Sequence, residues 1–296
     1  MMLAFPRIMY LVMILSIGLF SIEPGFAFGL DDLKKLQEKI EKSKDSAEKS
    51  KVKIDQVRGK VSQKEEIEIG GNLISGLLGA AALVDDAPLQ QYINDVGYWV
   101  ASQSKRKSLP WRFGVIQSDG INAFAAPGGY IVITLGLFQV LQNEAQLAAV
   151  LAHEIAHVAD KHHLKALQKT MKREFWSDIA LSAVGDATNR EKLEKMVNAG
   201  VQLYATGLDR NLEYEADLVA VVLAARAGYD PFALLDVLTT IDSINPGSAE
   251  MAVILKTHPP TLERLNQLAG KMDGKLDAFA NGRQNTKRFI AVTNQP

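Results

Sequence analysis

Two histidines four residues apart, with a glutamate directly after the first, constrain this chain more than any other feature. They are His153, Glu154 and His157 in the pattern His-Glu-x-x-His. On an α-helix, positions i and i+4 leave the same face one turn apart, so both imidazoles can bind one metal ion. Neutral imidazoles suit zinc, and the neighbouring glutamate is placed to hold a water molecule rather than the metal. A charged helix face exposed to solvent is the alternative that the rest of the chain must exclude.

The helix that carries this motif is predicted to begin near Asn143, with Gln146 as its capping-box partner three residues on. On one continuous helix, His162 and His163 would lie about 140° and 240° round from His157, outside its ligand set unless the helix has ended. Both are therefore expected at the surface or at a helix end. The predicted buried stripe of the helix comprises Leu147, Val150, Leu151, Ile155 and Val158.

Three short strands are expected before the motif. Alternating apolar residues predict a strand over 111–117, and two more are predicted over 122–126 and 130–134. Pro127-Gly128-Gly129 is strong turn chemistry, so the last two strands should form a hairpin.

Helical spacing governs most of the remaining chain. Gly70-Gly71 is expected to close an N-terminal helical arm, and a second helix should begin there. Gly228 and Pro231 are expected to stop a long helix that is interrupted near Gly207. The helices predicted outside the motif cover about residues 73–78, 89–100, 191–226, 231–242 and 260–270, with a polar stretch over 184–190.

A third metal ligand is expected downstream on another helix. Glu213 and Asp217 are four residues apart and share a helix face, so one can bind zinc while the other supports the site. Glu215 lies on the opposite side of that helix and is expected to face solvent. Taken alone, Glu213 would more simply be a surface carboxylate, and its pairing with the upstream motif favours the metal site.

Composition narrows the class of protein and its compartment. The 296 residues are enough for a domain with one full core. The net charge of −1 gives no indication of nucleic-acid binding. The chain has no cysteine, which excludes disulfides and thiolate ligands. Arg7 is followed by an apolar run over residues 8–20, and Gly25 and Ala27 are small residues at the −3 and −1 positions for cleavage after Ala27. This pattern is typical of a secretory signal peptide, with an uncleaved anchor as the alternative. We therefore expect export, to the periplasm or otherwise.

The chain is predicted to divide into four parts. Residues 1–27 would be the signal peptide, 28–66 a charged helical arm, 67–270 the domain that holds the predicted zinc site and 271–296 a polar tail. Within the arm, residues 30–66 follow the 3-4 spacing of a coiled coil, but the middle of the seam is weak. Self-association through 30–66 is one expectation, and a solvated, frayed helix is the other.

Four motifs follow one another along about residues 65–268. They are Asn122-Ala123-Phe124-Ala125-x-Pro127-Gly128-Gly129 with Gly136-Leu137, His153-Glu154-x-x-His157, Glu213-x-x-Ala216-Asp217, and Thr257-His258-Pro259-Pro260 with Arg264. In this order they resemble the gluzincin metallopeptidases of the HtpX and BepA type. That group also includes the CAAX-prenyl endopeptidases. No membrane span follows the signal, and residues 270–296 show no helix-pair repeat, so the resemblance is closest to compact periplasmic BepA-like members without helical repeats.

The resemblance implies a mainly helical α+β fold, a minigluzincin-like zincin domain with a small sheet packed beside the His-Glu-x-x-His helix. It implies one zinc ion per chain, held by His153, His157 and Glu213, with Glu154 as the general base. Asp217 would be a supporting or proton-donating carboxylate. His258 and Arg264 would lie near the site and stabilise the oxyanion, or His258 would occupy the open position on zinc in a resting state.

The function implied is an exported zinc endopeptidase that hydrolyses misfolded or unassembled envelope proteins, with a role in protein quality control. Its partners would be unfolded polypeptides and the envelope membrane, with strand 130–134 pairing with an extended substrate. The alternative is a zinc-stabilised chaperone or binding protein of the envelope, latched by His258 and with little turnover. Glu154 favours the enzyme, because a protein without hydrolytic activity would be expected to lose the base.

Overall fold

The computed structural model describes residues 61–169 and 207–293, and all of them belong to one compact unit, Asp55–Pro296. The predicted signal peptide, most of the predicted arm and the polar stretch 184–190 lie outside the described residues. Among the helices of these two ranges, none has the length and apolarity that a membrane span requires.

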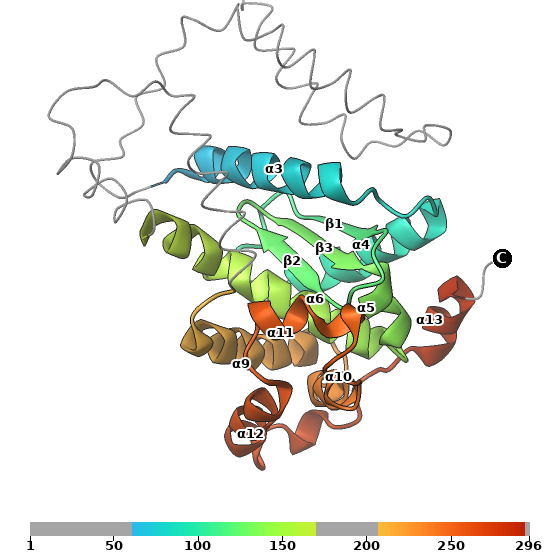
Figure 1. The fold of residues 1–296 in the computed structure, drawn as a ribbon. Helices are drawn as coiled ribbons and strands as arrows, with labels where there is room; N and C mark the ends of the chain where they lie inside the picture. The colour runs from blue at the N-terminus through green and yellow to red at the C-terminus, as the bar shows by residue number, and fades with distance from the viewer. Residues whose placement is uncertain (1–60, 170–206, 294–296) are drawn as a thin grey trace, which may run out of the picture. The chain divides into compact units, whose positions relative to one another are not determined.

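A small mixed sheet forms the centre of this unit (Figure 1). β3 (Tyr130–Thr134) is the middle strand, parallel to β1 (Arg112–Ile116) and antiparallel to β2 (Ala123–Ala126). The predicted hairpin of β2 and β3 is confirmed, and Gly128 and Gly129 of its turn have positive φ angles of 84° and 106°. The expectation that strand 130–134 pairs with a substrate is wrong, because both of its edges are occupied.

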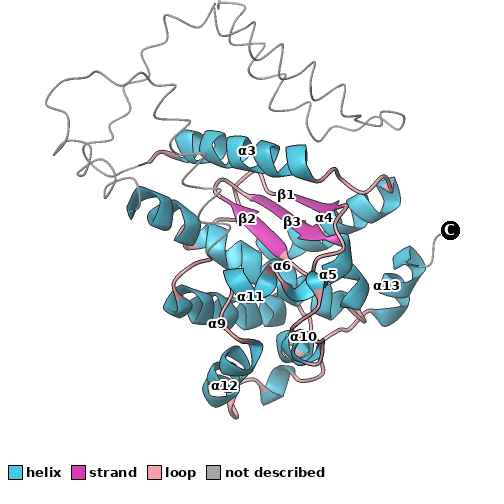
Figure 2. Cartoon of the chain, in the orientation of Figure 1, coloured by secondary structure: helices cyan, strands magenta, loops and turns pink. Residues whose placement is uncertain are grey.

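Helices cover both faces of the sheet (Figure 2). α3 (Gln63–Ala80) packs on one face, while α4 (Ala87–Ala101) and α6 (Glu144–Ala159) pack on the other. Every residue of β3 is therefore buried. Its side chains alternate between the two layers, as the period of a strand requires. This is the mainly helical α+β fold with a small sheet beside the motif helix that we expected.

α3 differs from the prediction at Gly70-Gly71, which was expected to separate two helices. The helix runs through both glycines without a break. A Cβ atom on Gly70 would lie 1.7 Å from the carbonyl oxygen of Pro127, so the glycine allows the helix to approach the hairpin turn. Gly70 and Pro127 are far apart in the sequence, so local spacing does not reveal this contact.

α6 carries the His-Glu-x-x-His motif and is buried along its whole length. It begins as predicted at Asn143, whose Oδ1 accepts a hydrogen bond from the Gln146 N–H at 3.0 Å. The returning bond of the expected capping box is displaced by one residue, because the Gln146 side chain accepts from the Gln142 N–H at 2.8 Å. The predicted apolar stripe is too narrow, since α6 packs against β2, α4, α9 (Arg210–Arg226) and α10 (Ala233–Asp242).

A buried carboxylate fixes the start of α6. Glu144 accepts hydrogen bonds from the hydroxyls of Tyr92 and Tyr229, both at 2.9 Å, and from the Asn285 amide at 2.7 Å. Arg288 pairs with the same carboxylate at 3.3 Å. Arg288 belongs to α13 (Thr286–Thr293), a helix that lies within the predicted polar tail and buries Phe289 against Tyr92 and Phe138. Buried polar groups with several partners hold neighbouring elements in one arrangement.

The remaining elements complete the C-terminal half. α9 ends at Arg226, in agreement with the predicted stop, and Gly228 has a positive φ of 82°. Residues 191–206 of the long predicted helix lie outside the described residues, so its interruption near Gly207 stays a prediction. The helices predicted over 89–100, 231–242 and 260–270 are confirmed within a few residues by α4, α10 and α12 (Thr261–Met272). Short elements connect or follow these helices: α5 (Leu135–Val140), η3 (Ala249–Met251), α11 (Ile254–Thr257) and η4 (Asp277–Phe279).

Candidate metal centre

α6 and α9 pack side by side and bring three predicted ligands together. The Nε2 atoms of His153 and His157, one turn apart on α6, lie 3.0 Å from each other. Glu213, in the first turn of α9, places Oε1 3.5 Å from Nε2 of His157 and Oε2 3.6 Å from Nε2 of His153. The three side chains are buried and converge on one point.

This donor set fits a zinc ion. Ligand atoms about 2.0–2.1 Å from a tetrahedral zinc lie roughly 3.3–3.4 Å from one another, close to the separations between these donors. Oε2 of Glu213 is buried and has no hydrogen-bond partner within the described residues. A buried carboxylate oxygen without a partner is unfavourable, and a cation at the convergence point would satisfy it.

His258 supplies a further nitrogen at the same place. It follows α11 directly, and its Nε2 lies 3.5 Å from Oε2 of Glu213. Thr257 Oγ1 lies 2.9 Å from its Nδ1, which orients the ring. One atom from each of His153, Glu213 and His258 lies within 4.8 Å of the others. This is the position that both expected roles of His258 require.

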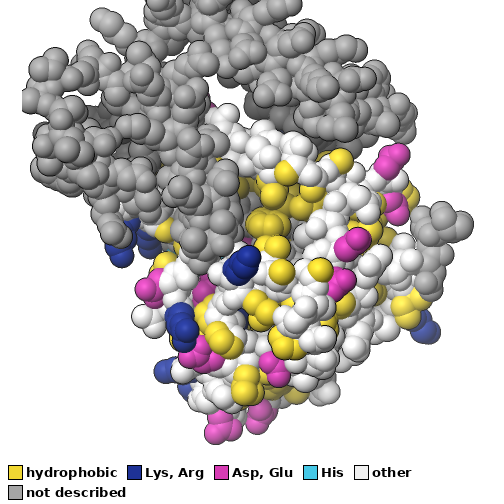
Figure 3. Space-filling view, in the orientation of Figure 1, with side chains coloured by type: hydrophobic (Ala, Val, Ile, Leu, Met, Phe, Trp, Pro, Cys, Tyr) yellow, Lys and Arg dark blue, Asp and Glu magenta, His cyan; other side chains and the backbone are white. Residues whose placement is uncertain are grey.

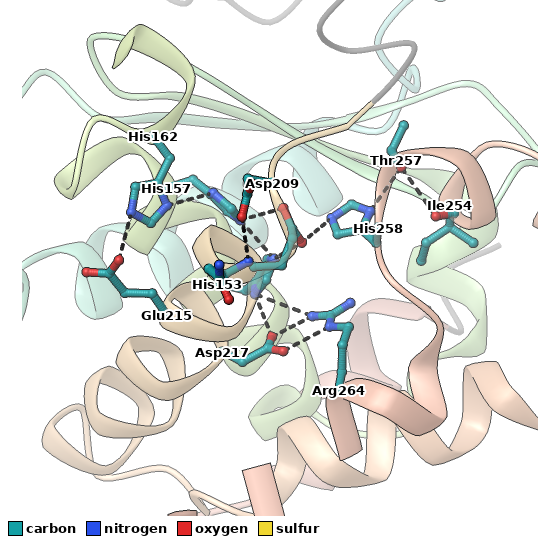
Figure 4. A network of polar contacts seen from close by, with 12 residues as sticks. His153, His157, His162, Asp209, Glu215, Asp217, Ile254, Thr257, His258 and Arg264 are labelled. Atoms are coloured by element: carbon teal, nitrogen blue, oxygen red, sulfur yellow. Dashed lines mark hydrogen bonds and ion pairs between the residues drawn. The ribbon is translucent and has the colours of Figure 1, made fainter. Parts of the chain in front are cut away.

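Asp217 and Arg264 lie on the Nδ1 side of His153, away from its ligand atom Nε2 (Figure 4). Oδ1 of Asp217 is 2.8 Å from Nδ1 of His153, on the side of the ring opposite Nε2. Arg264 donates to the same carboxylate from Nε at 2.9 Å and from Nη2 at 2.5 Å. The guanidinium is therefore occupied by Asp217. This position favours a role in holding Asp217 over the expected role in stabilising the oxyanion.

Burial and charge set the protonation of these groups. Burial raises the pKa of Asp217, but Arg264 and His153 outweigh it and hold that pKa well below its usual range. Burial also raises the pKa of Glu213, yet the charge of His258 and the contact with His153 bring it to about 2. Burial lowers the pKa of His153, whereas Asp217 raises it to about 9. His153 must lose a proton to offer Nε2 to a metal, so metal binding is coupled to proton release.

Glu154 faces a small cavity beside the three ligands. His157, Glu213 and His258 line the same cavity, and β2 with the preceding Asn122 forms the opposite wall. Burial raises the pKa of Glu154 to about 7, within the range that a general base needs near neutral pH. Both polar side-chain atoms of Asn122 are buried without a hydrogen-bond partner in the described ranges.

His162 lies at a helix end, as one of the two expectations had it, but it is buried and contacts a predicted ligand. α6 ends at Ala159, and Lys161 has a positive φ of 59°, so the chain turns before a new helical segment starts at His162. The side chain is 1% exposed instead of lying at the surface, and its Nδ1 is 3.1 Å from Nδ1 of His157. Glu215 is 56% exposed, as expected, but its Oε2 reaches to 3.7 Å from Nε2 of His162.

Sequence reasoning did not assign Asn122, Thr257, His162 or Glu215 a place in the site. For His162 a signal existed, because a histidine five residues after His157 can reach it once the helix has ended. Asn122 and Thr257 appeared only inside longer motifs, and their burial depends on tertiary packing.

Comparison with known proteins gives a consistent result. Residues 87–272 match the sequence family described as Peptidase family M48. The beta-barrel assembly-enhancing protease of Escherichia coli (strain K12) is 32% identical over 207 residues, which cover 68% of this chain and 42% of that protein. The one from Yersinia pestis is 29% identical over 208 residues, covering 68% and 43%. The mitochondrial metalloendopeptidase OMA1 of Schizosaccharomyces pombe is 27% identical over 181 residues, covering 61% and 52%.

The chain spans less than half of the length of the beta-barrel assembly-enhancing proteases that it matches. The matched part includes the metal centre, since all of its residues lie between positions 122 and 264.

Proposed function

Because this chain belongs to peptidase family M48, we propose that it is a zinc metalloendopeptidase whose ligands are His153, His157 and Glu213. One observation carries the proposal. Two imidazole nitrogens and a buried carboxylate converge on one point, beside a cavity that also holds Glu154. This donor set can hold a zinc ion that activates water, and the adjacent carboxylate can take the proton of that water, as hydrolysis of a peptide bond requires.

The side chains divide the work of the reaction. Zinc, when bound, polarises a carbonyl and makes water more acidic. Glu154 removes the proton from the attacking water and can deliver it to the leaving amine nitrogen. His258 can donate a hydrogen bond to the carbonyl oxygen as negative charge develops on it. Asp217, held by Arg264, accepts a hydrogen bond from the Nδ1–H of His153 and thereby keeps Nε2 available as a ligand.

The proposed substrates are misfolded or unassembled proteins of the cell envelope, reached after export and cleavage near Ala27. The resemblance to periplasmic BepA-like peptidases and the signal-like segment before Ala27 support this compartment. On the face drawn in Figure 3, acidic and basic side chains both occur around a central group of hydrophobic ones. Such a mixed surface suits varied polypeptides better than a polyanion. Association with the membrane and self-association through 30–66 belong to the same proposal.

Removal of the metal tests the proposed activity. We expect the zinc-loaded full chain to digest reduced casein, and 1,10-phenanthroline to stop the digestion as zinc leaves, because the ligands alone do not activate water. Adding back one equivalent of zinc should restore the rate, with metal content followed by atomic emission and cleavage by mass spectrometry. Digestion at an undiminished rate by protein shown to contain no metal would contradict the proposal.

A latched, zinc-stabilised chaperone or binding protein is the second candidate, favoured by the position of His258. Its Nε2 is 3.5 Å from a carboxylate oxygen of Glu213, so it can fill the position that water needs. In this arrangement the site would hold zinc without turnover.

His258→Ala separates the two candidates. If His258 assists the reaction, its loss should lower casein cleavage by about 10²-fold, as for other oxyanion donors. If it latches the site, the wild type should be inert at full zinc occupancy and His258→Ala should gain activity. The comparison is made at equal zinc content, with prevention of aggregation of an unfolded client as the second assay.

A further inference from the structure

We propose that His162 and Glu215 form a relay that positions His157 as a metal ligand by determining which of its ring nitrogens carries the proton. The inference rests on the proposed function, because it takes His157 to bind zinc through Nε2. His162 and Glu215 are positioning residues, since neither of them reaches the convergence point of the ligands.

Each ligand imidazole needs a partner for its second nitrogen. A histidine that binds a metal through Nε2 carries its proton on Nδ1, and an acceptor there fixes the tautomer and the ring orientation. For His153 that acceptor is the carboxylate of Asp217 at 2.8 Å. For His157 the group at Nδ1 is another imidazole, His162, at 3.1 Å (Figure 4).

The contact between the two imidazoles specifies where both protons lie. If His157 donates from Nδ1, then Nδ1 of His162 must be the unprotonated, accepting nitrogen. The proton of neutral His162 is then on Nε2, which points towards the Glu215 carboxylate. Glu215 favours this arrangement because a carboxylate stabilises an N–H directed at it. In the opposite tautomer, His162 would present a proton to Nδ1 of His157, and the proton of His157 would move to Nε2 and block the metal.

The distances also predict which of the two residues, His162 or Glu215, has the larger effect on His157. Nε2 of His162 and Oε2 of Glu215 are 3.7 Å apart, beyond the range of a direct hydrogen bond but close enough for the carboxylate charge to favour an N–H on Nε2. Asp160 lies in the same cluster, but its carboxylate is already paired with Lys105. Replacing His162 should therefore have the larger effect, and replacing exposed Glu215 a smaller one in the same direction.

Zinc affinity, measured by competition with a chromophoric chelator, tests the relay without reference to turnover. His162→Phe fills the space but offers no acceptor, and we expect zinc to bind about 10- to 100-fold more weakly. His162→Asn places an amide oxygen near the position of Nδ1, so it should keep most of the affinity. A rescue by asparagine distinguishes loss of the acceptor from loss of packing.

A double-mutant cycle tests whether Glu215 acts through His162. Glu215→Gln should weaken zinc binding in the wild-type background and have no effect in the His162→Asn background. Glu263→Gln is the matched control, because it removes one exposed negative charge from a helix beside the site while leaving the relay intact. An equal effect of Glu215→Gln in both backgrounds would mean a general charge effect and would overturn the relay.

Imidazole nitrogen NMR gives a direct readout, since the chain has only 5 histidines to assign. In the zinc-loaded wild type, we expect the proton of His157 on Nδ1 and that of His162 on Nε2. A proton on Nδ1 of His162, or wild-type zinc affinity in His162→Phe, would overturn the relay even though zinc binds. Failure of the wild type to bind zinc would instead overturn the proposed function.

Discussion

Replacing Glu154 by glutamine is expected to lower the rate of peptide hydrolysis by about 10²- to 10⁴-fold while zinc remains bound. The side chain keeps its size but can no longer accept the proton of the attacking water. Glu154 lies in the cavity beside His157 and Glu213, and burial brings its pKa to about 7, so the carboxylate is suited to this exchange of protons. Casein cleavage at equal zinc content measures the effect.

The matched control for this change is Glu263→Gln, at an exposed carboxylate that pairs with Arg210 outside the cavity. Zinc content and thermal unfolding of both variants should match the wild type. If Glu154→Gln cleaves casein as fast as Glu263→Gln does, another group is the base and the proposed assignment is wrong. If Glu154→Gln loses zinc, the Glu154 carboxylate helps to hold the metal and is not only the base.

Replacing Glu213 by alanine is expected to abolish stoichiometric zinc binding, and cleavage with it. The variant loses one of three ligands and the negative charge nearest to both imidazoles. The affinity should fall by more than the roughly 100-fold that follows loss of an outer contact. Metal analysis after dialysis measures the loss, and a variant that keeps one zinc per chain would exclude Glu213 from the ligand set.

Folding has to be separated from metal loss in that experiment. Glu213 is buried, and its removal leaves His153 and Arg264 with one carboxylate fewer. We therefore expect Glu213→Ala to unfold at a lower temperature than metal-depleted wild type. Circular dichroism at 20 °C should still show the helical content of the wild type, and Glu263→Ala should retain both stability and zinc.

The sequence predicted those parts of the structure that depend on near neighbours. The His-Glu-x-x-His helix, its cap at Asn143 and the Pro127-Gly128-Gly129 hairpin are local patterns, and the structure confirms them. The order of the strands did not follow from such local patterns, because only the pairing with distant β1 places β3 in the middle of the sheet. The unbroken course of α3 through Gly70 likewise depends on a contact with the hairpin turn that spacing cannot reveal.

In the site, too, some residues could be predicted from local spacing and others depended on the tertiary structure. His153, His157 and Glu213 were predicted from spacing and resemblance, and the structure brings them together. The place of His162 depended on the point at which α6 ends, and the positive φ of Lys161 makes that turn. Arg264 was expected to face the reacting carbonyl, but its partner Asp217 holds it on the other side of His153.

The burial of α6 on all sides has a consequence for how such a peptidase can change over evolutionary time. Close packing is achieved with small side chains, and a larger residue would cost about 1–3 kcal/mol of stability through overpacking. New substrate preferences are therefore more accessible on the opposite wall of the cavity, where the side chains of Phe124 and Leu208 are only partly buried. The buried alanines of α6, at which a larger side chain would not fit, are Ala145, Ala148, Ala149, Ala152, Ala156 and Ala159.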